Sequence, residues 1–217
     1  MNNFIIIPAY NEGEKIVEVI QQVKNYADKI IIVDDGSTDN TVKLAEEQKV
    51  IVLKQKVNLG KGATLRTGCD YAIKLGAENL VVMDSDGQHN PDHIPNFLKS
   101  LENNDIVFGY RKMSSSMPAV LKWGNNFINR ILTILCGIKM YDSQCGYRSF
   151  TADAYKKIKW KATDYYIETE MAIRVARSRL RYKQIPIETI YVDNYKGTTV
   201  LDGVKIVIKM VAQGLFG

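Results

Sequence analysis

The first half of the chain alternates short apolar runs with segments whose apolar residues recur at helical spacing. The apolar runs are continuous and rich in β-branched residues, as expected for strands buried on both faces of a sheet. We expect strands at residues 4–7, 30–33, 50–53, 80–83 and 106–108. Helices are predicted between them, at 16–23, around 42–45, at 61–75 and after Pro91. These repeated βαβ units indicate an α/β fold with a mixed, mostly parallel sheet and helices on both faces.

The second half has a different pattern. Residues 119–135 and 166–179 have the apolar spacing of helices, and residues 185–192 alternate like a strand. The last segment, from 200 to 216, is amphipathic, and the serine-rich stretch 112–118 is the best candidate for a mobile loop. No internal repeat or linker divides the chain.

Composition places the protein among ordinary globular domains, because 46% of its 217 residues are hydrophobic and 24% are charged. Its three cysteines are odd in number and include no C-x-x-C pair, which argues against disulfides and zinc and favours a reducing compartment. No signal peptide or apolar stretch of about 18 residues is visible. We therefore expect a cytoplasmic protein that is soluble or peripheral to a membrane.

Charge is distributed unevenly. Residues 1–110 carry 11 Lys and Arg against 16 Asp and Glu, a net charge of −5, whereas residues 111–217 carry 18 against 8, a net charge of +10. This asymmetry is compatible with metal or base binding in the first half and with anion or anionic-membrane contact in the second, or with a solvated surface alone. No groove-reading motif or aromatic platform indicates nucleic-acid binding.

Asp84 and Asp86 give the sharpest local signal. Ligands of an open parallel sheet bind at the carboxyl ends of its strands, and both residues follow a predicted buried strand. Two such carboxylates can face one hard cation, and Gln88 adds a neutral oxygen. Asp and Gly also form turns, but the position after a strand favours an Mg²⁺ or Mn²⁺ site.

Other strand ends carry candidate ligands for a nucleotide. Asp34 and Asp35 can accept hydrogen bonds from a base or a ribose, or simply form a turn and cap a helix. Lys61 can place an ammonium near a phosphate at the start of a helix. Neither a P-loop nor a G-x-G-x-x-G motif follows the first strand, which argues against a dinucleotide oxidoreductase.

Arg111 and Arg148 are candidates for a phosphate clamp, because guanidinium groups bind phosphate in bidentate fashion. Alternatively, Arg148 pairs with Asp142 as part of the structure. His89 and His93 lack a third nitrogen or sulfur ligand, so a zinc site is not expected.

Five motifs occur in order, at residues 8–12, 33–39, 58–62, 84–91 and 142–148. Together they resemble the family 2 glycosyltransferases, and within them the dolichyl-phosphate mannose synthase-like branch. Each motif is loose by itself, but five at compatible spacing over nearly the whole chain are specific. The resemblance implies a GT-A fold, which is a Rossmann-like nucleotide-sugar fold.

The resemblance also implies roles for individual residues. Asp84, Asp86 and Gln88 would hold the metal and the donor diphosphate, and Arg111 would face the acceptor phosphate. The nucleotide pocket would be lined by Pro8, Tyr10, Glu12, Val33 and Asp35.

The sequence departs from the family at several positions. Tyr110 replaces a serine before Arg111, and Asn194 stands where the family often has a phosphate-binding arginine, with Lys196 as a candidate substitute. Many relatives carry C-terminal transmembrane helices; here the amphipathic segment would lie in the membrane interface. We expect a GT-A domain at 1–199, with a nucleotide- and metal-binding half at 1–110 and an acceptor half at 111–199, and an amphipathic helix at 200–217.

The predicted reaction is an inverting, metal-dependent transfer of a sugar from a UDP- or GDP-sugar to a polyprenyl or dolichyl phosphate, at the cytoplasmic face of a membrane. Arg111, and Arg148 with it, would orient the acceptor phosphate, which needs no strong base. One alternative is a relative that acts on a sugar or protein hydroxyl, for which Asp142 is the candidate base. Another is a non-catalytic nucleotide-sugar-binding subunit. An oligomer is compatible with the sequence.

Overall fold

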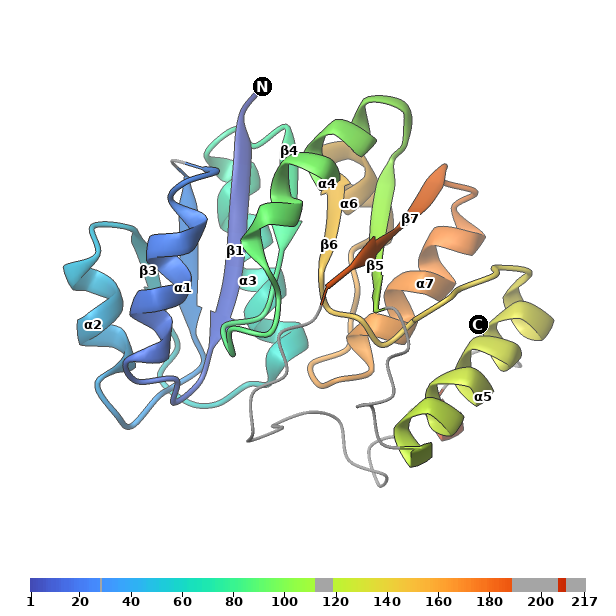
Figure 1. The fold of residues 1–217 in the computed structure, drawn as a ribbon, viewed down its shortest axis with the longest axis horizontal. Coiled ribbons are helices and arrows are strands. Elements are labelled where there is room, and N and C mark those ends of the chain that lie inside the picture. The colour runs from blue at the N-terminus through green and yellow to red at the C-terminus, as the bar shows by residue number, and fades with distance from the viewer. Residues whose placement is uncertain (28, 112–118, 189–206, 210–217) are drawn as a thin grey trace.

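The computed structural model describes residues 1–27, 29–111, 119–188 and 207–209, with only the backbone of 119–122. A seven-stranded sheet forms its centre, in the order β3-β2-β1-β4-β6-β5-β7 (Figure 1). The strands are β1 (Asn3–Ala9), β2 (Ile30–Asp34), β3 (Ile51–Lys54), β4 (Asn79–Val82), β5 (Ile106–Arg111), β6 (Arg148–Thr151) and β7 (Tyr182–Ile187).

Helices cover both faces of the sheet (Figure 1). Core side chains of α3, α5, α6 and α7 pack on one face, and those of α1, α2 and α4 pack on the other. The helices are α1 (Lys15–Val23), α2 (Thr41–Glu47), α3 (Lys61–Lys74), α4 (Ile94–Ser100), α5 (Ala119–Cys136), α6 (Ala152–Ile158) and α7 (Ile167–Arg177), with 3₁₀ turns η1 (Pro91–His93) and η2 (Leu101–Asn103).

Burial of β1 on both faces explains its uninterrupted apolar run. Ile6 packs into the core beneath α3, while its neighbours Ile5 and Ile7 point into the opposite core, and all three are inaccessible to solvent. Side chains alternate across a strand, so a strand covered on both sides needs apolar residues at every position. The predicted mixed α/β architecture is thereby confirmed.

β6 and α6 were not predicted from the sequence. β6 has only four residues, begins with an arginine and runs antiparallel to both β4 and β5. A short strand without an apolar run gives no periodic signal. Its insertion between β4 and β5 nevertheless joins the two halves of the chain into one sheet.

The other boundaries differ by a few residues. The strand expected at 185–192 is β7, which starts at Tyr182, and residues 189–192 lie outside the described residues. The loop predicted at 112–118, the residues Asn194 and Lys196, and most of the predicted helix at 200–217 also lie outside them, although 207–209 are helical. The domain division therefore stays a prediction. Among the described residues, no helix combines the length and apolarity that crossing a bilayer requires.

α3 lies unusually close to the sheet at Gly68. A Cβ atom at this position would lie 2.5 Å from Ile6 Cγ2 and 2.8 Å from Val33 Cγ2. Both neighbours are β-branched core residues of central strands, so neither can move easily.

We predict that Gly68→Ala destabilises the protein and that Gly124→Ala does not. Alanine improves helix propensity by about 1 kcal/mol at both sites, but only Gly68 is overpacked, at a cost of about 1–3 kcal/mol. A Cβ atom at Gly124, in α5, would meet nothing within 4 Å. Urea denaturation of both variants checks this, and equal free energies of unfolding would contradict the close packing of α3.

Candidate active site

A cavity of about 310 Å³ opens at the carboxyl edge of the parallel strands. Because β1, β2 and β4 run in the same direction, the loops that follow them meet there. The side chains that line it come from these loops, from the start of α3 and from the segment before α7. They are Pro8, Ala9, Tyr10, Glu12, Asp35, Asn58, Gly60, Lys61, Thr64, Asp84, Ser85, Asp86, Asp164 and Tyr165.

The loop after β4 brings Asp84 and Asp86 to the wall of this cavity. Gly87 turns the chain with a φ of 76°, a left-handed conformation that glycine adopts without strain. The backbone N–H of Gln88 donates to Asp86 Oδ1 at 3.0 Å. The two carboxylates therefore share one cavity, whereas the side chain of Gln88 is not part of its lining.

His89 supports this loop from the protein interior. Its Nδ1 accepts the backbone N–H of Asp84 at 3.1 Å, and its ring stacks on Tyr147 with centroids 4.9 Å apart. Burial lowers the pKa of His89 despite the nearby carboxylates, so the ring is neutral near pH 7. A neutral ring that accepts at Nδ1 carries its proton on Nε2, which lies 3.9 Å from Asp84 Oδ2.

Lys61, the first residue of α3, is held between two carboxylates. Its Nζ lies 2.7 Å from Asp84 Oδ1 and 2.9 Å from Glu168 Oε1. Burial alone would lower the pKa of Lys61, but the charges of Asp84 and Glu168 outweigh it and raise that pKa. Burial would likewise raise the pKa of Asp84, and chiefly Lys61 holds it below its ordinary value. Lys61 and Asp84 are therefore both ionised at neutral pH.

Gly146 leaves room for this ion pair. A Cβ atom there would lie 2.9 Å from both Asp84 Oδ2 and Lys61 Nζ. The glycine of the motif at 142–148 is thus required by the side chains at the cavity wall. Its φ is not in the left-handed region, so the turn itself does not demand glycine.

Asp35 organises the opposite wall. Its carboxylate accepts the backbone N–H of Leu59 at 2.7 Å and that of Gly60 at 3.0 Å, so it fixes the loop that precedes α3. A carboxylate has about four acceptor sites, so it can still accept further hydrogen bonds from a ligand in the cavity. Both alternatives weighed for this residue, a turn-forming and a ligand-facing role, are compatible with its position.

Several residues near the cavity were missed from the sequence, among them Glu168, Asp164 and Tyr165. These three come from the segment before α7, for which no element was predicted, and from the first turn of α7, which was predicted only as a helix. Gly60 and Gly62 allow this segment to approach, because a Cβ atom at either would collide with the backbone at residues 162–163. The pair of glycines around Lys61 is the signal that could have indicated such close contact.

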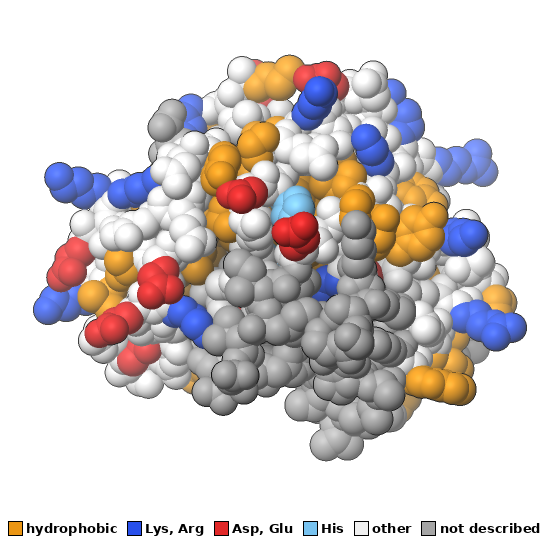
Figure 2. All heavy atoms as spheres, viewed as in Figure 1, with side chains coloured by type: hydrophobic (Ala, Val, Ile, Leu, Met, Phe, Trp, Pro, Cys, Tyr) orange, Lys and Arg blue, Asp and Glu red, His pale blue; other side chains and the backbone are white. Residues whose placement is uncertain are grey.

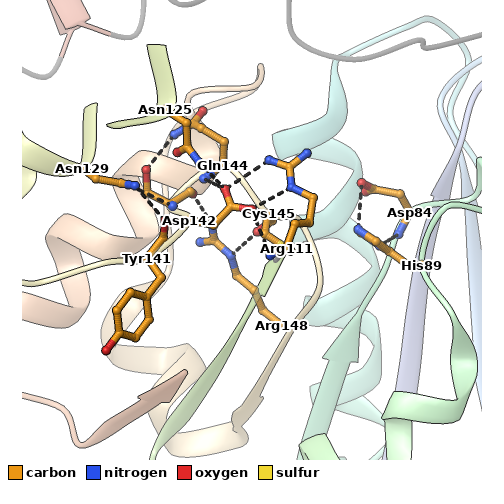
Figure 3. Close-up of polar contacts among 11 residues, drawn as sticks. Asp84, His89, Arg111, Asn125, Asn129, Tyr141, Asp142, Gln144, Cys145 and Arg148 are labelled. Carbon is orange, nitrogen blue, oxygen red and sulfur yellow. Dashed lines mark hydrogen bonds and ion pairs between the residues drawn. The ribbon is translucent and has the colours of Figure 1, made fainter. Parts of the chain in front are cut away.

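Arg111 and Asp142 form an ion pair near the loop after β4 that carries Asp84 and Asp86, which we call the acidic loop (Figure 3). Arg111 Nε donates to Asp142 Oδ2 at 2.7 Å and Nη2 donates to Oδ1 at 3.1 Å, in a bidentate arrangement. Asn125 Nδ2 adds a hydrogen bond to Oδ1 at 2.8 Å. Burial would raise the pKa of Asp142, but Arg111 holds it below its ordinary range, which makes Asp142 a poor general base.

The prediction that Arg148 belongs to a phosphate clamp is wrong. Its side chain is buried and donates to three backbone carbonyls, of Cys145 at 3.0 Å, Glu168 at 2.9 Å and Ser143 at 2.7 Å. It does not form the alternative pair with Asp142 either. Arg148 instead ties the segment at 143–148 to α7, and its burial leaves the guanidinium without access to a ligand in the cavity.

The remaining predicted pocket residues divide into two groups. Pro8, Tyr10 and Glu12 line the cavity, and the ring of Tyr10 is 44% exposed. Val33 does not, because its side chain is fully buried in the core beneath α3. The prediction that Val33 lines the nucleotide pocket is therefore wrong for this cavity.

Comparison with known families decides the assignment. Residues 4–164 match the family model described as glycosyl transferase family 2. The chain belongs to glycosyl transferase family 2. The matched region includes the cavity-lining residues from Pro8 to Asp164 and also the Arg111–Asp142 pair.

Relatives and solved structures agree with this assignment. The glycosyltransferase is 35% identical to UDP-N-acetylglucosamine–dolichyl-phosphate N-acetylglucosaminyltransferase of Methanococcus voltae, covering 96% of this chain and 94% of the relative. It is 27% identical to undecaprenyl-phosphate mannosyltransferase of Micrococcus luteus, covering 94% and 88%. Glucosyl-3-phosphoglycerate synthase from Mycobacterium tuberculosis shares the fold, with a TM-score of 0.80 at 18% identity over 98% of this chain and 79% of that one. The predicted GT-A fold is confirmed.

We predict that Gly146→Ala impairs the glycosyltransferase without unfolding it. The added Cβ meets only the ends of the Asp84 and Lys61 side chains, which can move, so stability should change by less than about 1 kcal/mol. Displacing that pair should raise the KM for the sugar donor about tenfold, equivalent to about 1.4 kcal/mol. Donor kinetics and urea denaturation separate the two effects, with Gly124→Ala as the control. An unchanged KM would show that the Asp84–Lys61 contact has no part in donor binding.

Proposed function

We propose that this glycosyltransferase moves a sugar from a UDP- or GDP-sugar to a polyprenyl or dolichyl phosphate at a membrane surface, with inversion at the anomeric carbon. The observation that carries the proposal is one cavity lined by Asp35, Asp84, Asp86 and Lys61, in which the Lys61 ammonium is paired with Asp84. The relatives from Methanococcus and Micrococcus, which are named as transferases to dolichyl phosphate and undecaprenyl phosphate, support the choice of a lipid phosphate acceptor.

The cavity wall opposite the acidic loop is suited to the nucleoside. Tyr10 offers an exposed ring on which a base can stack, and Glu12 and Asp35 offer acceptors for base N–H or ribose hydroxyl groups. Lys61 lies where the diphosphate would join this wall to the acidic loop. On donor binding, its ammonium can turn from Asp84 to a phosphate oxygen while Glu168 keeps hold of it.

The acidic loop fits a divalent cation. Asp84 and Asp86 provide two carboxylates at one cavity wall, and no three His, Cys, Asp or Glu side chains of the described residues form a complete metal site. Mg²⁺ and Mn²⁺ commonly bind through one or two carboxylates and complete their shell with substrate phosphates and water. Such an ion would neutralise charge that develops on the departing diphosphate. Gln88 stays a predicted ligand.

Arg111 would hold the acceptor. Its guanidinium is bidentate to Asp142 in this structure, and Figure 3 draws it on the side of Asp142 that faces Asp84. A phosphate monoester presents the same geometry of paired oxygens, and it is already anionic at neutral pH. Arg111 would therefore orient the phosphate for in-line attack, and no general base is required.

We predict that Asp86→Asn lowers kcat by at least about a hundredfold, because the site loses one of two metal-binding carboxylates. EDTA should abolish transfer by the wild type, and added Mn²⁺ or Mg²⁺ should restore it. Asp153→Asn, an exposed carboxylate on α6, is the matched control and should retain activity. Wild-type transfer that EDTA leaves unchanged would refute the metal role.

We also predict that the acceptor must carry a phosphate. Assays with a polyprenyl phosphate, the corresponding polyprenol and a free sugar should give product with the phosphate alone. A hydroxyl acceptor needs a general base. Asp142 is paired with Arg111 and its pKa is lowered, which argues against this alternative. Product from the polyprenol would favour that alternative, and donor binding without any product would favour a non-catalytic subunit.

A further inference from the structure

α5 exposes a row of large apolar side chains. Trp123 is 81% exposed, Phe127 55% and Ile134 73%, and the three positions lie within about 40° of arc on a helix that turns about 100° per residue. Leu135, at 42% exposure, lies between this row and the buried side of the helix. Such a contiguous apolar surface is unusual on a protein that water alone surrounds.

The opposite side of α5 packs against the domain. Ile128 and Leu132 are buried in the core that α7 shares, and Asn129 Nδ2 donates to the carbonyl of Tyr141. Asn125, also buried, donates to Asp142. The helix therefore has two apolar sides, of which one is needed for folding and the other has no such role.

Charge on α5 has a single sign. The 18 residues of the helix include Lys122 and Arg130 but no Asp or Glu, and they belong to the half of the chain with a net charge of +10. Arg130 is exposed and lies beside Trp123 on the helical projection. In Figure 2, exposed hydrophobic and basic side chains lie next to each other at the lower right, where Figure 1 draws α5.

We propose that the face formed by Trp123, Phe127, Arg130 and Ile134 docks on the surface of an anionic lipid bilayer. A helix with apolar residues on its outer face, tryptophan among them, and only cationic charge has the composition of an interfacial membrane helix. The inference rests on the proposed lipid phosphate acceptor, whose chain must stay in the bilayer while its phosphate reaches Arg111.

A bilayer fits this face better than a second copy of the chain. One face of a helix about 27 Å long offers a narrow strip, whereas a stable protein interface buries about 800 Å² on each partner. A membrane needs no complementary shape, and anionic headgroups match the basic charge.

Docking is tested with the full chain and vesicles that contain neither donor nor acceptor. We expect co-sedimentation with phosphatidylcholine vesicles containing 30% phosphatidylglycerol, and weaker binding to phosphatidylcholine alone. Phe127→Gln with Ile134→Gln should lower the partition coefficient at least tenfold, because two apolar side chains no longer enter the interface. Leu75→Gln, which changes an exposed leucine at the end of α3, should have no effect.

Tryptophan fluorescence gives an independent reading. Trp160 is 1% exposed and bonded to the carbonyl of Gly62, so Trp123 is the tryptophan that can enter a bilayer. Lipids with brominated acyl chains should quench its emission in the wild type and in Leu75→Gln, but much less in the double variant. Quenching that is equal in all three proteins would overturn the proposal.

The outcomes separate this inference from the proposed function. Wild-type protein that transfers sugar to a lipid phosphate but binds vesicles no better than the double variant refutes docking through α5 and leaves the proposed function standing. Vesicle binding as expected, with no transfer to any lipid phosphate, refutes the proposed function instead. If the wild type is a dimer, the double variant is a monomer and neither binds vesicles, the face belongs to an interface with a second copy.

Discussion

The ion pairs of Lys61 with Asp84 and Glu168 are the interaction on which the site depends. Burying a charged group away from water costs several kcal/mol for each ion, and only a nearby opposite charge and hydrogen bonds offset this cost. Here one ammonium serves two carboxylates, and within the described residues Glu168 Oε2 has no hydrogen-bond partner. The cluster thus carries an excess of negative charge, to which Asp86 adds. A divalent cation would balance it, so the electrostatics favour the ion that the proposed reaction requires.

Much of this arrangement could be predicted from the sequence, because it rests on local signals. Continuous β-branched runs located the five strands of the first half, and the rule that ligands gather at strand ends located Asp35, Asp84 and Asp86. Lys61 was located by its place at the start of a predicted helix, where an anion can bind. All four line one cavity.

The failures concern long-range packing. Arg148 looked like a ligand because a sequence does not reveal burial. Its guanidinium is buried and donates to the carbonyls of Ser143 and Cys145, nearby in the chain, and of Glu168 in α7. Val33 belongs to one of the five motifs. Successive side chains of β2 point to opposite faces of the sheet, however, and that of Val33 points into the core. Glu168 approaches Lys61 from 107 positions further along the chain, and no local pattern encodes such a contact.

The pair of Arg111 and Asp142 links the site to the outer surface. Asp142 accepts hydrogen bonds from Arg111 and from Asn125, and Asn125 belongs to α5. The position of Arg111 therefore depends on how α5 packs against the domain. Asp142 also accepts the backbone N–H of Arg111 at 3.2 Å and that of Gln144 at 3.3 Å. These bonds would keep its buried charge partly satisfied if the guanidinium turned toward an acceptor phosphate. Arg111 can therefore exchange one bidentate anion for another without leaving an isolated charge behind.

A lipid phosphate imposes a geometric condition on any such exchange. Its polyprenyl chain cannot leave the bilayer at an acceptable cost, since each exposed CH₂ group costs about 0.8 kcal/mol, so the phosphate stays at the level of the headgroups. The guanidinium that receives it must approach that level. α5 meets this condition by its two-sided construction: its inner side holds Asp142 through Asn125, and its outer side presents the apolar and cationic face. One helix would then set both the depth of the enzyme in the membrane interface and the position of Arg111, the proposed acceptor-binding residue.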